Sequence, residues 1–153
     1  IKNPVTGCAL LANRALVEKA CPLPEEAVMH DHWLALVASA FGKIDFIAEP
    51  LVKYRQHGRN VVGAQGYTWS NIFGRLLQGC GNVDITPLRR QAGVFYSRFA
   101  ERLGPQQASI IDGFARLSAL SWWGRRKFLV HRGILLPGVV RNMALLFCAR
   151  LSG

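Results

Sequence analysis

The chain has 153 residues, of which 50% are hydrophobic and 18% charged, so it is long and apolar enough to fold around a core and is not a disordered sequence. Its formal charge of +10 is concentrated in one half. Residues 1–74 carry seven Lys or Arg against six Asp or Glu, whereas residues 75–153 carry twelve against three. The four cysteines form no C-x-x-C pair, which argues against a disulfide framework and predicts buried free thiols.

The first half of the chain alternates between patterns typical of strands and of helices. The apolar run VTGCALLA (5–12) predicts a buried strand, and Asn13 can cap a helix that must end at CPLPEE, where two prolines forbid continuation. A second helix is predicted from Asp31 to Phe41, with Gly42 just past its end. KIDFIAEPLVKYRQH (43–57) then predicts two short extended segments. These patterns indicate an α/β fold.

The second half changes to apolar residues at three- and four-residue spacing, which is typical of helices. The clearest segment is TPLRRQAGVFYSRFAERLG, where Thr86 is predicted to cap, Pro87 to open the helix, and Gly104-Pro105 to end it. Further helices are predicted over TWSNIFGRLLQGC, PQQASIIDGFARLSALSWW and PGVVRNMALLFCARL. We therefore expect two parts: an α/β part over 1–66 and a basic helical extension over 67–153.

The start of the second helix, MHDHWLALVASAF, holds more polar chemistry than a helix start requires. One capping oxygen would suffice, yet an acid, two imidazoles and an indole stand together at residues 30–33. The neighbouring apolar residues are expected in the core: Met29, Leu34, Leu36 and Val37. Three motifs occur in order: NPVTGCALLANRALVEKA, MHDHWLALVASAFGKI and YRQHGRNVVGA. Together they resemble the C-terminal half of a bacterial family 2 glycosyltransferase domain, of the rhamnosyltransferase type that builds surface polysaccharides. The resemblance covers about residues 1–65 and implies a partial GT-A (Rossmann-like) segment with few strands.

The resemblance implies an inverting transfer of a hexosyl group to a sugar hydroxyl. Such a reaction needs a base to take the hydroxyl proton and positive charge to stabilise the leaving nucleoside diphosphate. The acid of the motif at the helix start corresponds to Asp31. A carboxylate there is kept ionised by the positive helix end, although a plain capping role is the alternative.

Other roles follow from the same resemblance. Gly7 and Cys8 correspond to the turn that approaches the donor sugar, although Gly7 could equally be a bulge glycine. His30 would shape the donor pocket, and the role of His32 is open. Trp33 would offer its ring face to the acceptor sugar, with a core tryptophan as the alternative.

The third motif supplies two candidates for the diphosphate. Arg55 could pair with phosphate oxygens or be an exposed strand arginine. His57 corresponds to a ligand of the metal or the diphosphate, where imidazole suits Mn²⁺ better than Mg²⁺, and a loop histidine is the alternative. The expected cofactor of a longer enzyme is therefore a divalent metal, Mn or Mg. No metal is expected to bind this chain by itself.

The donor-binding half of such an enzyme has no counterpart here, since the chain contains neither a D-x-D motif nor a glycine-rich phosphate loop. It also opens on Ile1 rather than Met, and we expect it to be an inactive piece of a longer polypeptide. Its strands would lack sheet partners, so a homodimer is one expectation. The implied partners are a nucleotide-diphosphate sugar donor and a saccharide or lipid-linked saccharide acceptor.

The segment SWWGRRKFLVHRGILLPGVVRNMALLFCARL (121–151) combines a tryptophan pair, a basic cluster and a final apolar stretch of about 15 residues, shorter than the roughly 20 that span a membrane. Basic and aromatic residues together suit the surface of an anionic membrane. The alternative is that the aromatic residues pack inward and the arginines form a solvated face. The expected location is the cytoplasm, peripheral on the inner face of the cell membrane.

Two other functions compete with the enzyme. One is a basic helical module that binds anionic membrane or nucleic acid, as the charge of the second half would allow. Nucleic acid is not expected, because the basic residues are scattered among apolar ones and form no recognised motif. The other is a structural zinc site built from Cys8, Cys21, His30 and His32, which would require an unusual spacing.

Overall fold

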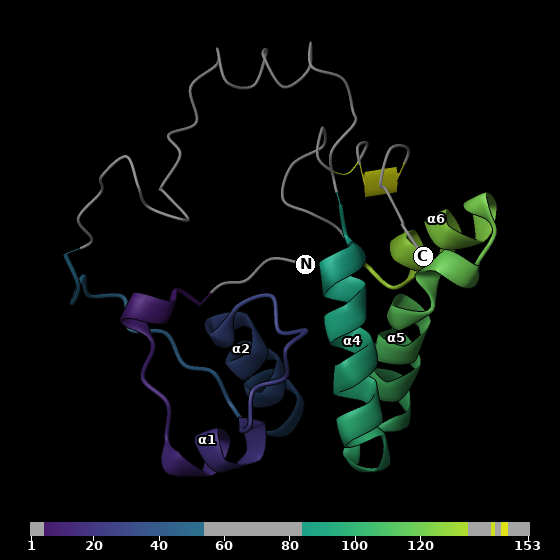
Figure 1. Cartoon of the computed structure of the whole chain (residues 1–153). Coiled ribbons are helices and arrows are strands. Elements are labelled where there is room, and N and C mark those ends of the chain that lie inside the picture. Colours follow the sequence, from purple (N-terminus) through teal and green to yellow (C-terminus); the bar gives the residue numbers. More distant parts are fainter. Residues whose placement is uncertain (1–4, 54–83, 135–141, 143–144, 147–153) are drawn as a thin grey trace, which may run out of the picture.

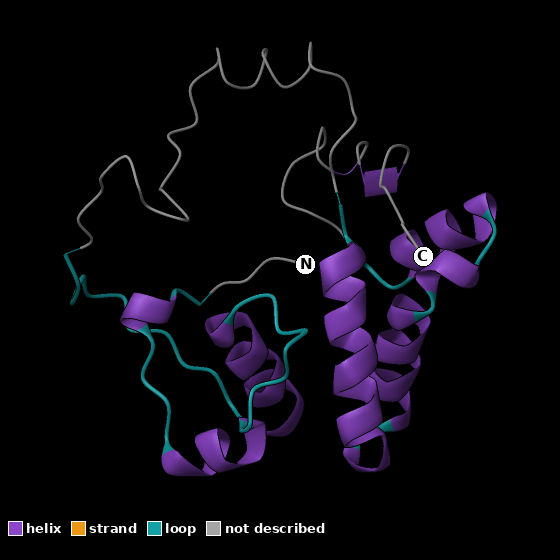
Figure 2. Ribbon diagram, viewed as in Figure 1, coloured by secondary structure: helices purple, strands orange, loops and turns teal. Residues whose placement is uncertain are grey.

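The computed structural model describes residues 5–53, 84–134, 142 and 145–146. Its elements, in chain order, are η1 (Gly7–Ala9), α1 (Arg14–Ala20), α2 (His30–Phe41), α4 (Thr86–Phe99), η2 (Ala100–Arg102), α5 (Pro105–Ala115), η3 (Leu117–Ala119) and α6 (Trp122–His131). Helix accounts for 64% of the described residues, which include no β-strand (Figure 2). The described part of the fold is therefore mostly helical.

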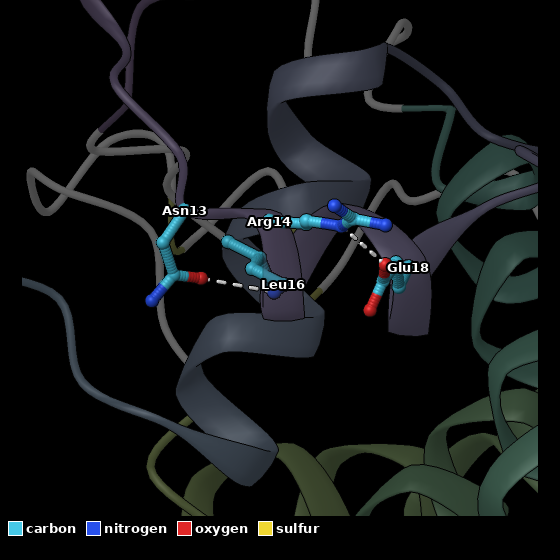
Figure 3. A network of polar contacts seen from close by, with 4 residues as sticks. All are labelled: Asn13, Arg14, Leu16 and Glu18. Carbon is cyan, nitrogen blue, oxygen red and sulfur yellow. Dashed lines mark hydrogen bonds and ion pairs between the residues drawn. The ribbon is translucent and has the colours of Figure 1, made fainter.

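The ends of α1 and α2 lie close to where the sequence predicts them. The Asn13 side chain accepts a hydrogen bond from the backbone N–H of Leu16 at 2.9 Å and so caps α1 (Figure 3). The ion pair between Arg14 and Glu18 on the same helix is exposed and adds little stability. At the end of α2, the N–H of Gly42 donates to the carbonyl of Ala38, which closes the last turn.

The strand predicted over residues 5–12 is not formed. Gly7–Ala9 make one turn of 3-10 helix, flanked by extended backbone at Thr6 and Leu10. Residues 43–53 form no strand either, and Phe46 is 89% exposed. A strand must pair its backbone with a second strand, and no described segment pairs with either of these. Local apolar patterning was therefore insufficient to predict a strand here.

Helices α4 and α5 lie side by side as a helical hairpin (Figure 1). Thr86 is the first residue of α4 rather than its cap, and its N–H donates to the Asp84 carboxylate at 2.9 Å. Gly104 separates the two helices, and its N–H donates to the side-chain oxygen of Gln107 at 3.2 Å, while Pro105 opens α5. The helix predicted to end at Gly104-Pro105 ends as an α-helix at Phe99, and the turn η2 carries the chain to Arg102, just before that pair. The helix predicted over 68–80 lies outside the described residues, as does most of the one predicted over 137–151.

One hydrophobic core draws on both halves of the chain. Its buried members are Ala20, Trp33 and Val37 from the first half and Phe95 and Phe99 from α4. The rings of Trp33 and Phe95 meet edge to face, with centroids 5.5 Å apart. The boundary predicted between residues 66 and 67 lies outside the described residues, but the segments on either side of it share this core. Met29, predicted to be a core residue, is instead exposed at the position just before α2.

Polar contacts also join the halves. The guanidinium of Arg98 on α4 donates to the carbonyls of Lys19, Cys21 and Pro22, which lie at the end of α1. The carbonyl of Lys19 is one of those that a helix end leaves without an intrahelical partner, and Cys21 and Pro22 follow directly after the helix. Arg98 therefore ties α4 to the last turn of α1.

A second hydrophobic cluster positions α6. Leu129 of α6 is buried with Ile85, Leu117 and Leu145. The ring of Phe128 packs against this cluster and rests on Gly113 of α5, where an added Cβ would come within 2.4 Å of Phe128 Cε2. The absence of a side chain at residue 113 thus lets α6 approach α5.

Candidate functional site

The four side chains of residues 30–33, at the start of α2, differ in how far they are exposed to solvent. His30 is exposed, Asp31 and Trp33 are buried, and His32 is half-buried. Asp31 lies in the first turn, and its Oδ1 accepts a hydrogen bond from the backbone N–H of His32 at 2.7 Å. This position places a carboxylate near the positive end of the helix, as predicted. Met29, rather than Asp31, stands at the N-cap position.

Two of the sequence motifs meet at Gly7. A Cβ added to Gly7 would lie 2.6 Å from Nε2 of His30 and 3.4 Å from Oδ2 of Asp31. The first of these separations is shorter than any ordinary contact, so glycine at residue 7 permits the turn of η1 to lie against the start of α2. The structure thus brings Gly7, His30 and Asp31 together. Cys8, the next residue, is an exposed free thiol, which makes the prediction of a buried thiol wrong at this position.

His32 is held by a residue that sequence analysis missed. Gln91 of α4 is almost fully buried; its Oε1 accepts from the N–H of Val28 at 2.7 Å and its Nε2 lies 3.0 Å from Nδ1 of His32. Because Oε1 already faces a donor, the amide N–H points at Nδ1, and a neutral imidazole can accept it. Burial, the largest cause, lowers the pKa of His32 from its usual 6.5.

A sequence signal for Gln91 did exist. Gln91 lies four residues before Phe95 and eight before Phe99, and so falls on the apolar stripe of α4. A lone amide on such a stripe must find a buried partner, because an unpaired one is costly. The sequence could have indicated that Gln91 is paired, although not with which residue.

Trp33 does not fit the predicted acceptor role. It is fully buried, its Nε1–H donates to the carbonyl of Ala20 at 3.0 Å, and Phe95 and Phe99 contact its ring. No face of the indole is left for a sugar in this structure. The core alternative therefore holds, and Trp33 joins α2 to α1 and α4.

A catalytic base must be accessible to the hydroxyl group that it deprotonates, and Asp31 is not accessible in this structure. Asp31 is only 3% exposed, and the turn at Gly7 lies beside both its carboxylate and the ring of His30. An acceptor hydroxyl would reach the carboxylate only if part of the surrounding structure moved. Arg55 and His57, predicted to meet the diphosphate or the metal, lie outside the described residues.

No metal site is formed by the residues that the structure describes, where no three His, Cys, Asp or Glu side chains gather closely enough to hold an ion. Cys8, Cys21, His30 and His32 therefore do not assemble the zinc site considered as an alternative. Cys21, like Cys8, is an exposed free thiol.

An open groove lies elsewhere, between α1 and the end of α4. It is lined by charged side chains of both signs, including Glu18, Lys19, Glu101 and Arg102. None of the predicted site residues borders it. Because its charges are of both signs, the groove has no preference for an anionic sugar donor. The candidate site therefore remains at the start of α2.

No protein-family model, curated protein or solved structure matches this chain. The family resemblance therefore depends on the three sequence motifs alone. Within residues 5–53 and 84–134 and the short described pieces after them, no helix combines the length and apolar character needed to cross a bilayer.

Proposed function

We propose that the chain is the acceptor-side part of an inverting, nucleotide-sugar-dependent glycosyltransferase of bacterial surface polysaccharide synthesis, with an O-antigen or rhamnan as the product class. One observation carries the proposal: the TGC turn and the HDHW helix start, 23 residues apart in sequence, are in contact through Gly7, His30 and Asp31. The resemblance predicts that these two motifs act at one site.

In the proposed reaction, Asp31 accepts the proton of a sugar hydroxyl. The hydroxyl oxygen forms a bond to the anomeric carbon as the bond to the nucleoside diphosphate breaks, and the configuration inverts. Asp31 lies in the first turn of α2, and the ionised carboxylate is the form that can accept a proton. The partners are a nucleotide-diphosphate sugar and a saccharide or lipid-linked saccharide.

A divalent ion, Mn²⁺ or Mg²⁺, would neutralise the leaving diphosphate in such an enzyme. The described residues provide no cluster of side chains that fits such an ion. The α/β, GT-A part of the proposal likewise requires a sheet contributed by residues beyond those described. Because Asp31 is only 3% exposed, the proposed reaction also requires a movement that opens this site to an acceptor.

The test is Asp31→Asn in the polypeptide encoded by the complete gene, assayed with radiolabelled nucleotide sugars and bacterial membranes. The amide retains the oxygen that accepts from the N–H of His32 but cannot take a proton. Loss of a general base should lower the transfer rate by about 10²–10⁴-fold. Asp45→Asn is the matched control, because Asp45 is an exposed acid that pairs only with Lys43 among the ion pairs of the described residues.

Transfer by the Asp31→Asn protein at a rate near that of the wild type would refute the role of Asp31. A melting temperature measured on the same samples separates catalysis from folding. We expect Asp31→Asn to melt close to the wild type, and Asp31→Ala to melt earlier because it loses the hydrogen bond in the first turn.

A further inference from the structure

The surface of α6 that faces away from the core carries large apolar side chains. Leu129 and Phe128 hold the helix against Leu117 and its neighbours. On the outer side, Trp122 is 48% exposed, Trp123 is 75% exposed and Val130 is 56% exposed. Isolated apolar residues are common on protein surfaces, but two adjacent exposed tryptophans at the start of one helix form a patch.

The spacing of this helix brings basic groups into the same patch. Residues four apart lie on the same side of an α-helix, so Trp122, Arg126 and Val130 form one row. Trp123 and Lys127 form the adjacent row, and we call these five residues the α6 face. The guanidinium of Arg126 stacks on the ring of Trp122, with its Cζ 2.9 Å from the ring centroid.

The rings of the tryptophan pair contact each other at the start of α6. The two rings meet edge to face, with centroids 4.6 Å apart and planes at 86°. The Ser121 side chain caps the helix by accepting from the N–H of Gly124 at 3.2 Å. Trp123 is therefore presented to solvent by a capped helix, which reduces the entropy that it would lose on binding.

The charge around the α6 face is of one sign. No Asp or Glu follows Asp112 in the sequence, whereas Arg125, Arg126, Lys127 and Arg132 all fall on or next to α6. Arg125 donates to the backbone carbonyl of Ser118, and Arg132 donates to the hydroxyl of Ser109. Because both acceptors are neutral, the positive charges of the two arginines are not neutralised. Burial and the nearby charges of Arg125 and Arg90 lower the pKa of Arg89, as expected where cations are crowded together.

We propose that the α6 face docks on the surface of an anionic lipid bilayer. Indole rings prefer the interfacial region, where the ring is buried and the N–H can still reach polar groups. Lys127, which is exposed, can extend its charged end to a lipid phosphate while its methylene stem covers apolar surface. The guanidinium of Arg126, held against Trp122, adds positive charge to the α6 face without reaching outward. The aliphatic side chain of Val130 favours a membrane over nucleic acid, since it gains from acyl chains but has no partner on a phosphate backbone. This docking does not depend on the proposed sugar transfer.

The test uses the whole chain with vesicles of equal parts phosphatidylcholine and phosphatidylserine, and with vesicles of phosphatidylcholine alone. We expect co-sedimentation with the anionic vesicles, a loss of binding as salt rises, and a blue shift of tryptophan fluorescence. Trp123→Ser should weaken binding about tenfold, and Lys127→Glu roughly tenfold to thirtyfold. Because both side chains are exposed, these variants should fold as the wild type does.

Matched controls lie away from the α6 face. Phe46→Ser removes an exposed aromatic ring and Lys53→Glu reverses an exposed charge, and neither should change vesicle binding by more than about twofold. The proposal is overturned if the chain fails to sediment with anionic vesicles at low salt, or if Trp123→Ser binds as the wild type does. Tighter binding to a DNA duplex than to the vesicles would assign the α6 face to nucleic acid instead.

Discussion

The buried amide of Gln91 offers a direct test of how the two halves of the chain are joined. Gln91→Leu keeps the approximate side-chain volume but removes the hydrogen bonds to the N–H of Val28 and to Nδ1 of His32. Each such bond contributes about 1 kcal/mol, and groups left without a partner add to the loss. The apolar leucine recovers part of this, so we expect a net destabilisation of about 2 kcal/mol and a melting temperature lower by about 4–8 °C.

Urea unfolding followed by circular dichroism, together with thermal melts, would measure this change. Gln106→Leu is the matched control, because Gln106 is exposed on α5 and its replacement should alter stability by less than about 0.5 kcal/mol. A Gln91→Leu protein as stable as the wild type would contradict the pairing described here.

Gln91→Glu tests the direction of the hydrogen bond to His32. The introduced carboxylate still accepts from the N–H of Val28 but places an oxygen acceptor opposite Nδ1 of His32. Protonating His32 resolves this conflict, so its pKa should rise above 6.5 in the folded variant. The stabilising contribution is then present below pH about 6.5 and lost as pH rises through the new pKa. The same pH dependence in variant and wild type would refute this arrangement.

Three further predictions concern His32 itself, the approach of α6 to α5, and the contact between α4 and α1. In the wild type, the pKa of His32 is lowered in the folded state, so the unfolded chain binds a proton at His32 more readily than the folded chain does. The free energy of unfolding should therefore fall as pH drops below about 6.5. This part of the pH dependence should disappear in His32→Gln. Gly113→Ala places a methyl group against the ring of Phe128 and should lower the free energy of unfolding in urea by about 1–3 kcal/mol. Gly93→Ala is the control: its added Cβ would lie 3.9 Å from Cβ of Ala115, so it should be neutral or stabilising by up to about 1 kcal/mol. Arg98→Ala removes the link to the end of α1 and should cost about 1 kcal/mol in thermal melts, against no measurable effect for the exposed Arg102→Ala.

The exposed apolar side chains show why the predicted strands failed. Residues 5–12 and 43–53 have strand-like composition, but Leu11 and Phe46 are almost fully exposed in the structure. A helix closes its hydrogen bonds within one segment, whereas a strand needs a partner that its own sequence does not contain. This difference explains why the helices of this chain were predicted more accurately than its strands.

The HDHW cluster shows the same limit for the site. The sequence indicated that residues 30–33 hold more polar chemistry than a cap requires, and the placement of Asp31 in the first turn agrees with that prediction. The sequence could not assign a role to each residue of the cluster, because Trp33 packs in the core with Phe95 whereas His32 pairs with Gln91. These partners come from a helix about 60 residues away in sequence, and only packing brings them together.

The sequence by itself determined where several helices begin and end, because Asn13, Gly42 and the Gly104-Pro105 pair act on backbone groups within a few residues. It also determined the one-sided charge of the second half, which follows from composition alone. Only the tertiary structure decided that Trp33 is a core residue, that Gly7 lies against Asp31, and that the tryptophans of α6 face solvent. Burial and contact depend on which segments meet, and that is a property of the whole folded chain.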